Sequence, residues 1–279
     1  MRQTITPQIE HPEVIQFGDI VYANRFDDYH QESIPLKLHL LRPNGQGNRW
    51  DRLPLFVWVA GGGFRKSTPL YALPFLTWFA QRGFVAASVQ HRTCTQQAFP
   101  AAVQDVKAAV RFLRSRADVY GIDPERVALG GESAGGYLAA LAGLCPDEPA
   151  FKTSDWPEAP DDVQAVVSWY APFTLKGSPL QSDLLGDSAE QLPGIAGLTE
   201  IEPHITVDAP PFLLMHGVKD AVVPVTQSRM FYEALVRAGV EAEYYELEGA
   251  GHGSIEFVQP QVQQIVLSFL NKHLTIGGS

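Results

Sequence analysis

The sequence predicts an α/β fold with a mostly parallel sheet and helices on both of its faces. Runs that are apolar at nearly every position alternate with segments in which apolar residues recur at spacings of three and four, as strands and helices do in turn. The composition, 45% hydrophobic and 19% charged, is that of an ordinary globular protein. No repeat or linker divides the chain, so residues 1–279 are expected to form a single domain.

The first two expected strands differ in how many of their faces are buried. Ile34, Leu36, Leu38 and Leu40 alternate with less hydrophobic residues, which predicts an antiparallel strand at the edge of the sheet with one face in water. Residues 55–60 are apolar at every position, as expected of a central strand that helices cover on both faces.

Strands and helices then alternate along the rest of the chain. We expect strands at residues 84–89, 126–130, 163–169, 212–215 and 243–247. Helices are expected at residues 99–116, from residue 134 onward, before Gly239 and across residues 262–270. Between Pro172 and Pro210 the rhythm breaks into a segment rich in Gly, Pro, Ser and Asp, so residues 173–209 are interpreted as a small lid or cap insertion.

Charge and composition disfavour several classes of partner. The net charge is −10, with 31 acidic against 21 basic residues, which argues against nucleic acid and against an anionic membrane surface. No apolar stretch is long enough to span a bilayer, and the N-terminus lacks the apolar core of a secretory signal. Cys94 and Cys145 have no metal-type spacing and are expected to be reduced thiols. A cytoplasmic protein without a membrane anchor is therefore expected.

The segment Gly131-Glu-Ser-Ala-Gly135 lies between a short expected strand and a helix. In that context Ser133 occupies a sharp turn, and the glycines on either side let the strand and the helix approach closely. Three fixed positions in five are a weak pattern alone, and the strand-turn-helix context strengthens it. Ser133 is the predicted nucleophile.

A serine hydroxyl needs a base to accept its proton and a carboxylate to orient that base. After such a turn the acid precedes the histidine in the chain. His252 lies in a glycine-rich loop between a strand and the last helix, whereas His273, near the tail of that helix, is expected to be solvated. Asp220 directly follows an apolar strand, where α/β sheets carry functional groups, while its rival Asp208 precedes that strand. The alternative for Asp220 is a turn or a helix cap.

Negative charge on a reacting carbonyl oxygen requires fixed hydrogen-bond donors. The run Ala60-Gly-Gly-Gly-Phe64 follows the central strand, and we predict an oxyanion hole made by the amides of Gly62, Gly63 and Ala134. The alternative, a phosphate-binding loop, is disfavoured because neither a P-loop Lys-Ser/Thr pair nor a G-x-G-x-x-G pattern is present.

These motifs together resemble the hormone-sensitive-lipase-like and the bacterial feruloyl and acetyl-xylan esterase-like (BD-FAE) members of the α/β-hydrolase superfamily. The resemblance runs from about Leu53 to His252 and includes His216-Gly-Val-Lys-Asp220 and Gly249-Ala-Gly-His252. It implies an α/β-hydrolase fold and hydrolysis of carboxylic esters through an acyl-enzyme, with neither a metal nor an organic cofactor. One departure is Ala60, which stands where the family usually has a histidine that holds the glycine loop.

Aromatic residues that follow the expected strand ends are candidates for a substrate pocket, although in a core of this size aromatics more often serve packing. These candidates are Phe64, Trp169, Tyr170 and Phe173.

The main hypothesis is a serine carboxylesterase acting on short-chain acyl or aryl esters, including acetyl or feruloyl groups on carbohydrates. The alternatives are a peptidase or amidase of the prolyl-oligopeptidase-like type and a non-catalytic relative that binds a small molecule. The expected partner is a small-molecule ester, and a homodimer is a possible assembly.

Overall fold

The computed structural model describes residues 3–44, 52–186 and 194–274. Eight strands form one sheet in the order β1-β2-β4-β3-β5-β6-β7-β8. The strands β1 and β2 are antiparallel to each other, β2 is antiparallel to β4, and all later pairs are parallel. Their bounds are β1 Val14–Asp27, β2 Glu32–Pro43, β3 Leu53–Val59, β4 Val85–Val89, β5 Ile122–Glu132, β6 Ala165–Trp169, β7 Phe212–Gly217 and β8 Ala242–Leu247.

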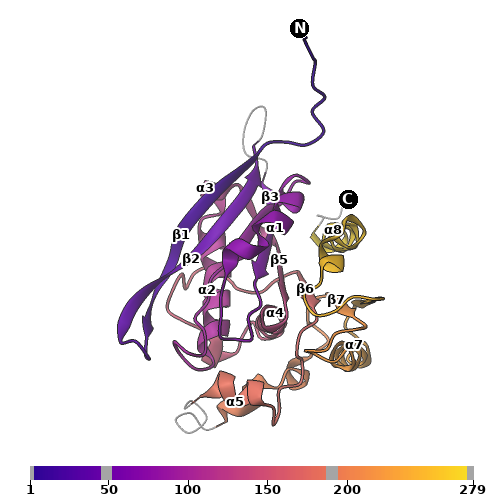
Figure 1. Cartoon of the computed structure of the whole chain (residues 1–279). Coiled ribbons are helices and arrows are strands. Elements are labelled where there is room, and N and C mark those ends of the chain that lie inside the picture. Colours follow the sequence, from indigo (N-terminus) through magenta and orange to yellow (C-terminus); the bar gives the residue numbers. More distant parts are fainter. Residues whose placement is uncertain (1–2, 45–51, 187–193, 275–279) are drawn as a thin grey trace.

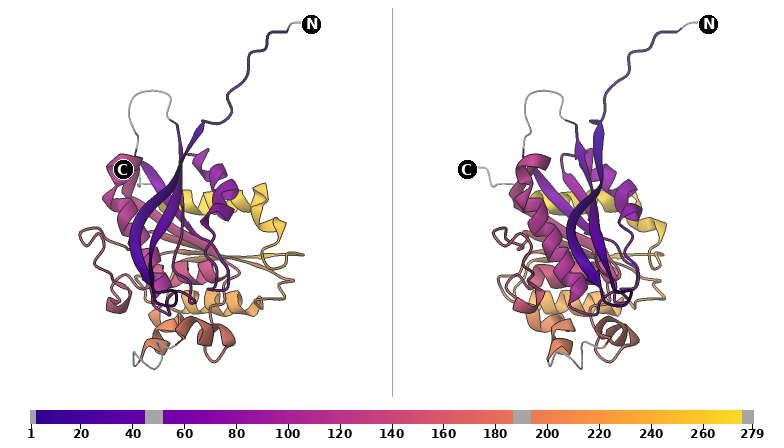
Figure 2. Two further views of the ribbon diagram at one scale, coloured as in Figure 1. Left: turned by 60° about the vertical axis from the view of Figure 1, so that its left-hand side comes forward. Right: turned by 90° about the vertical axis from the view of Figure 1, so that its left-hand side faces the viewer.

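Helices cover both faces of the sheet, as the sequence predicts (Figures 1 and 2). One face packs against α2, α4 and α7, and the other packs against α1 and α8. The α-helices are α1 Leu73–Ala80, α2 Ala101–Ser115, α3 Ala117–Tyr120, α4 Ala134–Leu144, α5 Pro179–Leu185, α7 Thr226–Arg237 and α8 Pro260–Leu274. Short 3-10 helices are η1 Pro69–Ala72, η2 Pro149–Phe151, η3 Ile195–Thr199, η4 Glu202–His204 and η5 Ile255–Val258.

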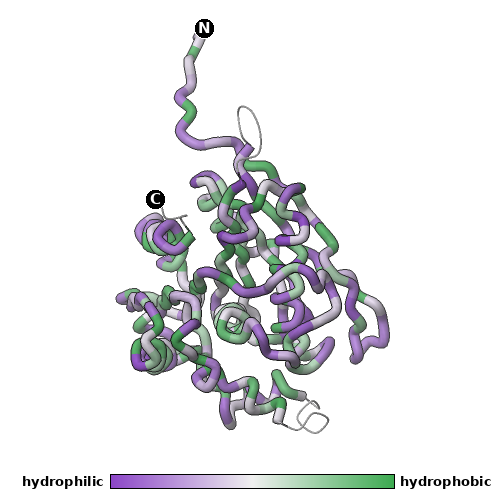
Figure 3. Tube along the Cα trace, turned by 180° about the vertical axis from the view of Figure 1, so that it is seen from behind, coloured by the Kyte–Doolittle hydropathy of each residue, from purple (hydrophilic) through white to green (hydrophobic). Residues whose placement is uncertain are grey.

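The central strands are the most hydrophobic part of the molecule. Every residue of β4, β6 and β7 is buried, because helices cover both faces there. Figure 3 shows hydrophobic segments within the body of the molecule and a largely hydrophilic N-terminal tail, which extends away from the body in every view. Within the described ranges, no helix has the length and hydrophobicity needed to cross a membrane.

Two features differ from the sequence-based expectation. The strand β2 is antiparallel as predicted, but it is not the edge, because β1 pairs with its outer side. The sequence hides β1, because two register irregularities between Phe17 and Ala23 break its period-two pattern. The helix α1 was also not predicted. Its own residues are apolar on nearly all sides of the helix, so its sequence shows no helical period.

Residues 173–209, the predicted lid, carry α5, η3 and η4 in their described parts, while residues 187–193 lie outside the described ranges. In Figure 1 these elements lie below the sheet, next to α7. Arg65 pairs with Asp183 of α5 at 2.6 Å, and the Tyr137 hydroxyl donates to the Thr199 carbonyl at 2.6 Å. These contacts tie the segment to the end of the sheet that carries Ser133, and a lid motion stays a prediction.

Candidate active site

Ser133 occupies the sharp turn between β5 and α4. Its backbone has φ 53° and ψ −125°, a conformation that costs about 1–3 kcal/mol in a residue other than glycine and that surrounding contacts must enforce. The Ser133 amide donates to the Trp169 carbonyl at 2.9 Å, and a β-carbon at Gly135 would lie 2.0 Å from the Val59 carbonyl oxygen. The glycine lets α4 pack directly against β3, so that the half-buried Ser133 lies at the carboxyl end of the sheet.

The three residues predicted from chain order form one hydrogen-bonded chain. His252 Nε2 lies 3.0 Å from Ser133 Oγ, and His252 Nδ1 lies 2.7 Å from Asp220 Oδ2. The other carboxylate oxygen, Asp220 Oδ1, accepts the amides of Val222 and Val223, each at 2.8 Å. Asp220 therefore caps a turn and contacts His252 at the same time, and its catalytic role stays a prediction.

The rival residues lie elsewhere. Asp208 is exposed in the turn before β7, at the opposite end of that strand from Asp220. His273 is not solvated as expected: its side chain is 11% exposed, packs against Phe269 and lies 3.7 Å from Glu241. The amphipathic face of α8 places His273 against the sheet, and burial lowers the pKa of its imidazole.

His216, at the end of β7, is a buried neighbour of Asp220 that the sequence analysis did not single out. Its Nε2 lies 2.9 Å from the Val223 carbonyl oxygen and 3.3 Å from Asp220 Oδ2, and its Nδ1 lies 2.7 Å from Ser228 Oγ. Burial lowers the pKa of this imidazole. A histidine in an otherwise apolar strand was the signal in the sequence that could have revealed His216.

The glycine loop lies beside Ser133. The amide of Gly61 donates to Glu132 Oε1 at 2.9 Å, and the amides of Arg65 and Lys66 both donate to the Gly62 carbonyl at 3.1 Å. Within the described residues, the amides of Gly62 and Gly63 have no internal acceptor, and the amide of Ala134, as the first residue of α4, has no helical one. The predicted donors Gly62, Gly63 and Ala134 thus lie free at the wall of the cavity that contains Ser133.

Two adjoining cavities open at this point. The one that contains Ser133 and His252 has a volume of about 450 Å³, and Phe64 and Tyr170 belong to its wall. The second has a volume of about 420 Å³, and six of the 13 residues that line it are aromatic, among them Trp58, Phe75, Trp169, Tyr170 and Phe257. Tyr71, Glu132, Tyr170 and Gly253 line both. Of the four predicted pocket residues, Phe173 lines neither cavity and stacks on Phe231 at 4.0 Å.

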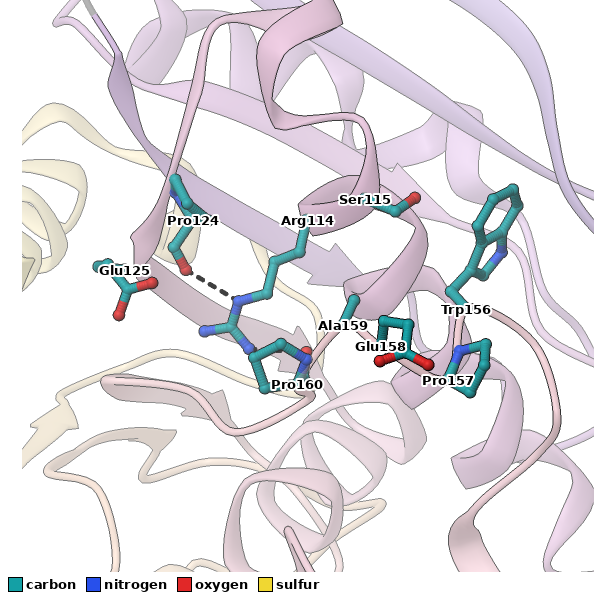
Figure 4. Close-up of a pocket in the computed structure, with 9 residues that line it drawn as sticks. All are labelled: Arg114, Ser115, Pro124, Glu125, Trp156, Pro157, Glu158, Ala159 and Pro160. Atoms are coloured by element: carbon teal, nitrogen blue, oxygen red, sulfur yellow. Dashed lines mark hydrogen bonds between the residues drawn. The ribbon is translucent and has the colours of Figure 1, made fainter.

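A further cavity of about 390 Å³ lies at the amino-terminal end of β5, away from Ser133. Figure 4 shows the Arg114 guanidinium pointing toward Pro124, whose carbonyl accepts from it at 2.8 Å. The same side chain also donates to the carbonyls of Pro160 and Asp162. The hydrogen bonds of the Arg114 guanidinium therefore hold these loops together. In the part of the chain that the structure describes, no cluster of His, Cys, Asp and Glu is arranged to hold a metal ion.

A mostly parallel eight-stranded sheet with a strained serine after β5 and with acid and histidine loops after β7 and β8 defines the α/β-hydrolase class. Within this class the chain belongs to the BD-FAE family, whose model matches residues 39–235.

Relatives of similar sequence include an esterase and a probable carboxylic ester hydrolase. Esterase LipC of Mycobacterium tuberculosis is 33% identical over 214 residues, which cover 72% of this chain and 53% of that protein. The probable carboxylic ester hydrolase LipM of the same organism is 28% identical over 245 residues, which cover 84% of this chain and 54% of that protein. The chain spans about half the length of the curated relatives it matches.

Solved structures match the whole fold. The native structure of esterase 2 from Thermogutta terrifontis superposes with a TM-score of 0.75 at 26% identity, covering 98% of this chain and 97% of that one. A truncated carbohydrate esterase from gut microbiota superposes with a TM-score of 0.80 at 24% identity, covering 96% and 99%, and at that identity it supports the fold alone.

Proposed function

We propose that the protein hydrolyses carboxylic esters, with Ser133 as nucleophile, His252 as general base and Asp220 as the group that orients His252. The observation that supports this most is the hydrogen-bonded chain from Ser133 Oγ through His252 to Asp220, with distances of 3.0 Å and 2.7 Å, at the wall of a cavity that glycine amides also line. Asp220 favours the tautomer in which His252 Nδ1 carries the proton and Nε2 is free to accept one.

In the first step, the proton of Ser133 Oγ moves to His252 Nε2 as Oγ bonds to the ester carbonyl carbon. The carbonyl π electrons move to the oxygen, which accepts hydrogen bonds from the amides of Gly62, Gly63 and Ala134. The imidazolium then gives its proton to the departing alcohol oxygen as the C–O bond breaks. An acyl-enzyme and a free alcohol result.

In the second step, His252 takes a proton from a water molecule whose oxygen attacks the acyl carbon. The new oxyanion is stabilised by the same amides, and the bond from the acyl carbon to Ser133 Oγ breaks as Oγ regains a proton from His252. The products are a carboxylic acid and the free enzyme.

The substrates we propose are esters of short acyl or aryl groups, with acetyl or feruloyl groups on carbohydrates among them. The second cavity, of about 420 Å³ and with six aromatic residues in its lining, adjoins the cavity of Ser133 and offers space for a flat apolar group. Trp169 is one of the aromatic residues that line this cavity.

The test is release of p-nitrophenol from acetate, butyrate and octanoate esters by the wild type and by Ser133→Ala. We expect turnover that falls in the variant by about 10⁴-fold or more. Esterase 2 of Thermogutta terrifontis is phosphorylated by paraoxon, and we expect paraoxon to inactivate this protein with a mass increase on the peptide of Ser133. A folded wild type that cleaves no ester and ignores paraoxon would contradict the proposal, and turnover of p-nitroanilides alone would favour an amidase.

A further inference from the structure

Glu132, the residue before Ser133, connects three parts of the site. Its Oε1 accepts the amide of Gly61 at 2.9 Å, and its Oε2 accepts the indole N–H of Trp58 in a short hydrogen bond. Gly61 belongs to the glycine loop, and Trp58 belongs to β3, which leads into that loop. One carboxylate therefore links the residue next to the nucleophile, the strand and the loop.

The glycine loop needs such a link because Ala60 has no polar side chain to hold it. Among the described residues, the other hydrogen bonds to the backbone of the loop include those of the Arg65 and Lys66 amides, which donate to the Gly62 carbonyl, and that of the Cys94 amide, which donates to the Phe64 carbonyl. Of these hydrogen bonds, that of Glu132 joins the loop directly to the residue before the nucleophile.

We propose that Glu132 is a positioning residue that fixes the glycine loop relative to Ser133, and thereby sets the distance between the oxyanion donors and the attacking oxygen. This inference rests on the proposed esterase function. Gly61 is the neighbour of Gly62, and Glu132 is the neighbour of Ser133. A shift of the contact between the carboxylate and Gly61 therefore changes the position of the oxyanion donors relative to the nucleophile. Displacements of about 1 Å at reacting groups cost about 100-fold in rate.

The two N–H donors contact different oxygens of Glu132, and a carboxylate presents an acceptor to each of them without a competing donor. Glutamine keeps the reach of Glu132 but replaces one acceptor by an NH₂ group, which would face an N–H. Aspartate keeps both acceptors and the charge, but it is one methylene shorter and does not reach Gly61 and Trp58 together. The two substitutions thus remove the contact in two different ways.

Protonation of Glu132 has the same effect as the glutamine, because the acid then carries a proton on one oxygen. Burial raises the pKa of this carboxyl to about 7, against the opposing effect of its two hydrogen bonds. The titratable groups that line the two cavities with it are Tyr71, Tyr170 and His252. Full contact therefore requires a pH above about 7.

The experiment compares Glu132→Gln and Glu132→Asp with the wild type, using Glu233→Gln on the exposed surface of α7 as the matched control. With p-nitrophenyl acetate at pH 8, we expect kcat to fall about 10- to 100-fold in both Glu132 variants while KM stays within about threefold. The control should match the wild type. Below pH 7, the kcat of the wild type should fall more steeply than that of Glu132→Gln, because only the wild type protonates at this position.

Hydrogen–deuterium exchange of residues 60–66 supplies a readout that does not depend on turnover. We expect the Gly61 amide to exchange faster in both Glu132 variants at an unchanged melting temperature, since a broken contact frees that amide. Unchanged exchange and wild-type kcat in either variant would overturn the proposal. A full kcat in Glu132→Asp alone would also overturn it, because the charge and not the contact would then be the cause. Absence of turnover in the wild type would instead count against the esterase function.

Discussion

His216 Nε2 lies 3.3 Å from Oδ2 of Asp220, the oxygen that also contacts His252. Two imidazoles thus flank one carboxylate, but they differ in environment. His216 is fully buried and its Nε2 is 2.9 Å from the Val223 carbonyl oxygen, so that this nitrogen carries the proton of a neutral ring. It supports the turn that presents Asp220, while His252 lies at the cavity wall.

Because burial lowers the pKa of His216 below its usual 6.5, the unfolded chain takes up a proton near pH 6 that the folded chain does not. Stability is therefore lost as the pH falls from 6.5 toward the lower folded pKa. We expect this residue to cost the wild type up to about 1.4 kcal/mol between pH 7.5 and 5.5. Urea unfolding of the wild type and of His216→Gln at both pH values checks this. An equal pH dependence in the two proteins would show that His216 is protonated in the fold.

Asp220→Asn should abolish most activity without unfolding the protein. An asparagine cannot both accept the amides of Val222 and Val223 and accept the N–H of His252 with the same geometry, so the favoured tautomer of His252 is lost. We expect kcat for p-nitrophenyl acetate to fall about 10⁴-fold. Asp208→Asn, in the exposed turn before β7, is the matched control and should retain wild-type kcat. A loss in Asp208→Asn comparable with that in Asp220→Asn would contradict the assignment.

Two neighbouring glycines of the loop should respond differently to alanine. A β-carbon at Gly62 (φ +149°) would lie 2.5 Å from the Lys66 carbonyl oxygen, whereas one at Gly63 (φ +59°) would meet nothing within 4 Å. Gly62→Ala must therefore shift the loop, and we expect kcat to fall about 100-fold, the loss typical of one oxyanion donor. Gly63→Ala should lower stability by about 1–2 kcal/mol and kcat by less than about tenfold. The reverse ranking in kcat would show that the loop is not held as described.

The sequence predicts the central sheet well because β3, β4, β6 and β7 are covered by helices on both faces and are therefore apolar at nearly every position. It does not reveal β1, since register irregularities erase the alternation of that strand, and the resulting assignment of β2 to the edge was wrong. Whether a strand lies at the edge of a sheet depends on which strands pair with it. A pairing strand whose sequence shows no alternation cannot be recognised from the sequence.

Some residues of the candidate site could be predicted from the sequence, and others could not. Ser133, Asp220 and His252 were predicted because their chain order and loop positions follow from the chemistry of an activated serine. Glu132 and His216 were not given roles, because their importance lies in contacts with Gly61 and Asp220 that only the folded chain creates. Phe173 was placed among pocket residues on its position after a strand, yet its ring stacks on Phe231 of α7.

The second cavity should decide which acyl groups are accepted. Val258 lines this cavity and is 45% exposed, so Val258→Trp should fill its entrance without disturbing the core. We expect kcat/KM for methyl ferulate to fall at least about tenfold, roughly the value of a lost pocket contact, while methyl butyrate changes less than about threefold. Val236→Trp on α7, at 52% exposure and outside both cavities, is the control. Equal losses for both esters would place the aryl group elsewhere.

Asp161 neutralises two buried cations between α2 and the loop before β6. Its carboxylate lies 2.8 Å from Lys107 Nζ and 2.5 Å from Arg111 Nη1, and the exposed fractions of the Lys107 and Arg111 side chains are 0% and 5%. Asp161→Ala leaves both charges buried without their carboxylate, which costs about 3–5 kcal/mol in the free energy of unfolding.

The adjacent Asp162 is the control for this substitution. It lies 3.5 Å from Arg114 and its side chain is 52% exposed, so Asp162→Ala should cost less than about 1 kcal/mol. Guanidinium unfolding at pH 8 measures both variants. Since Arg114 also donates to the carbonyls of Pro160 and Asp162, its charge keeps partners in the control, whereas Lys107 keeps mainly the Cys145 carbonyl in Asp161→Ala. Similar losses of unfolding free energy in the two variants would mean that Asp161 does not neutralise the buried charges of Lys107 and Arg111.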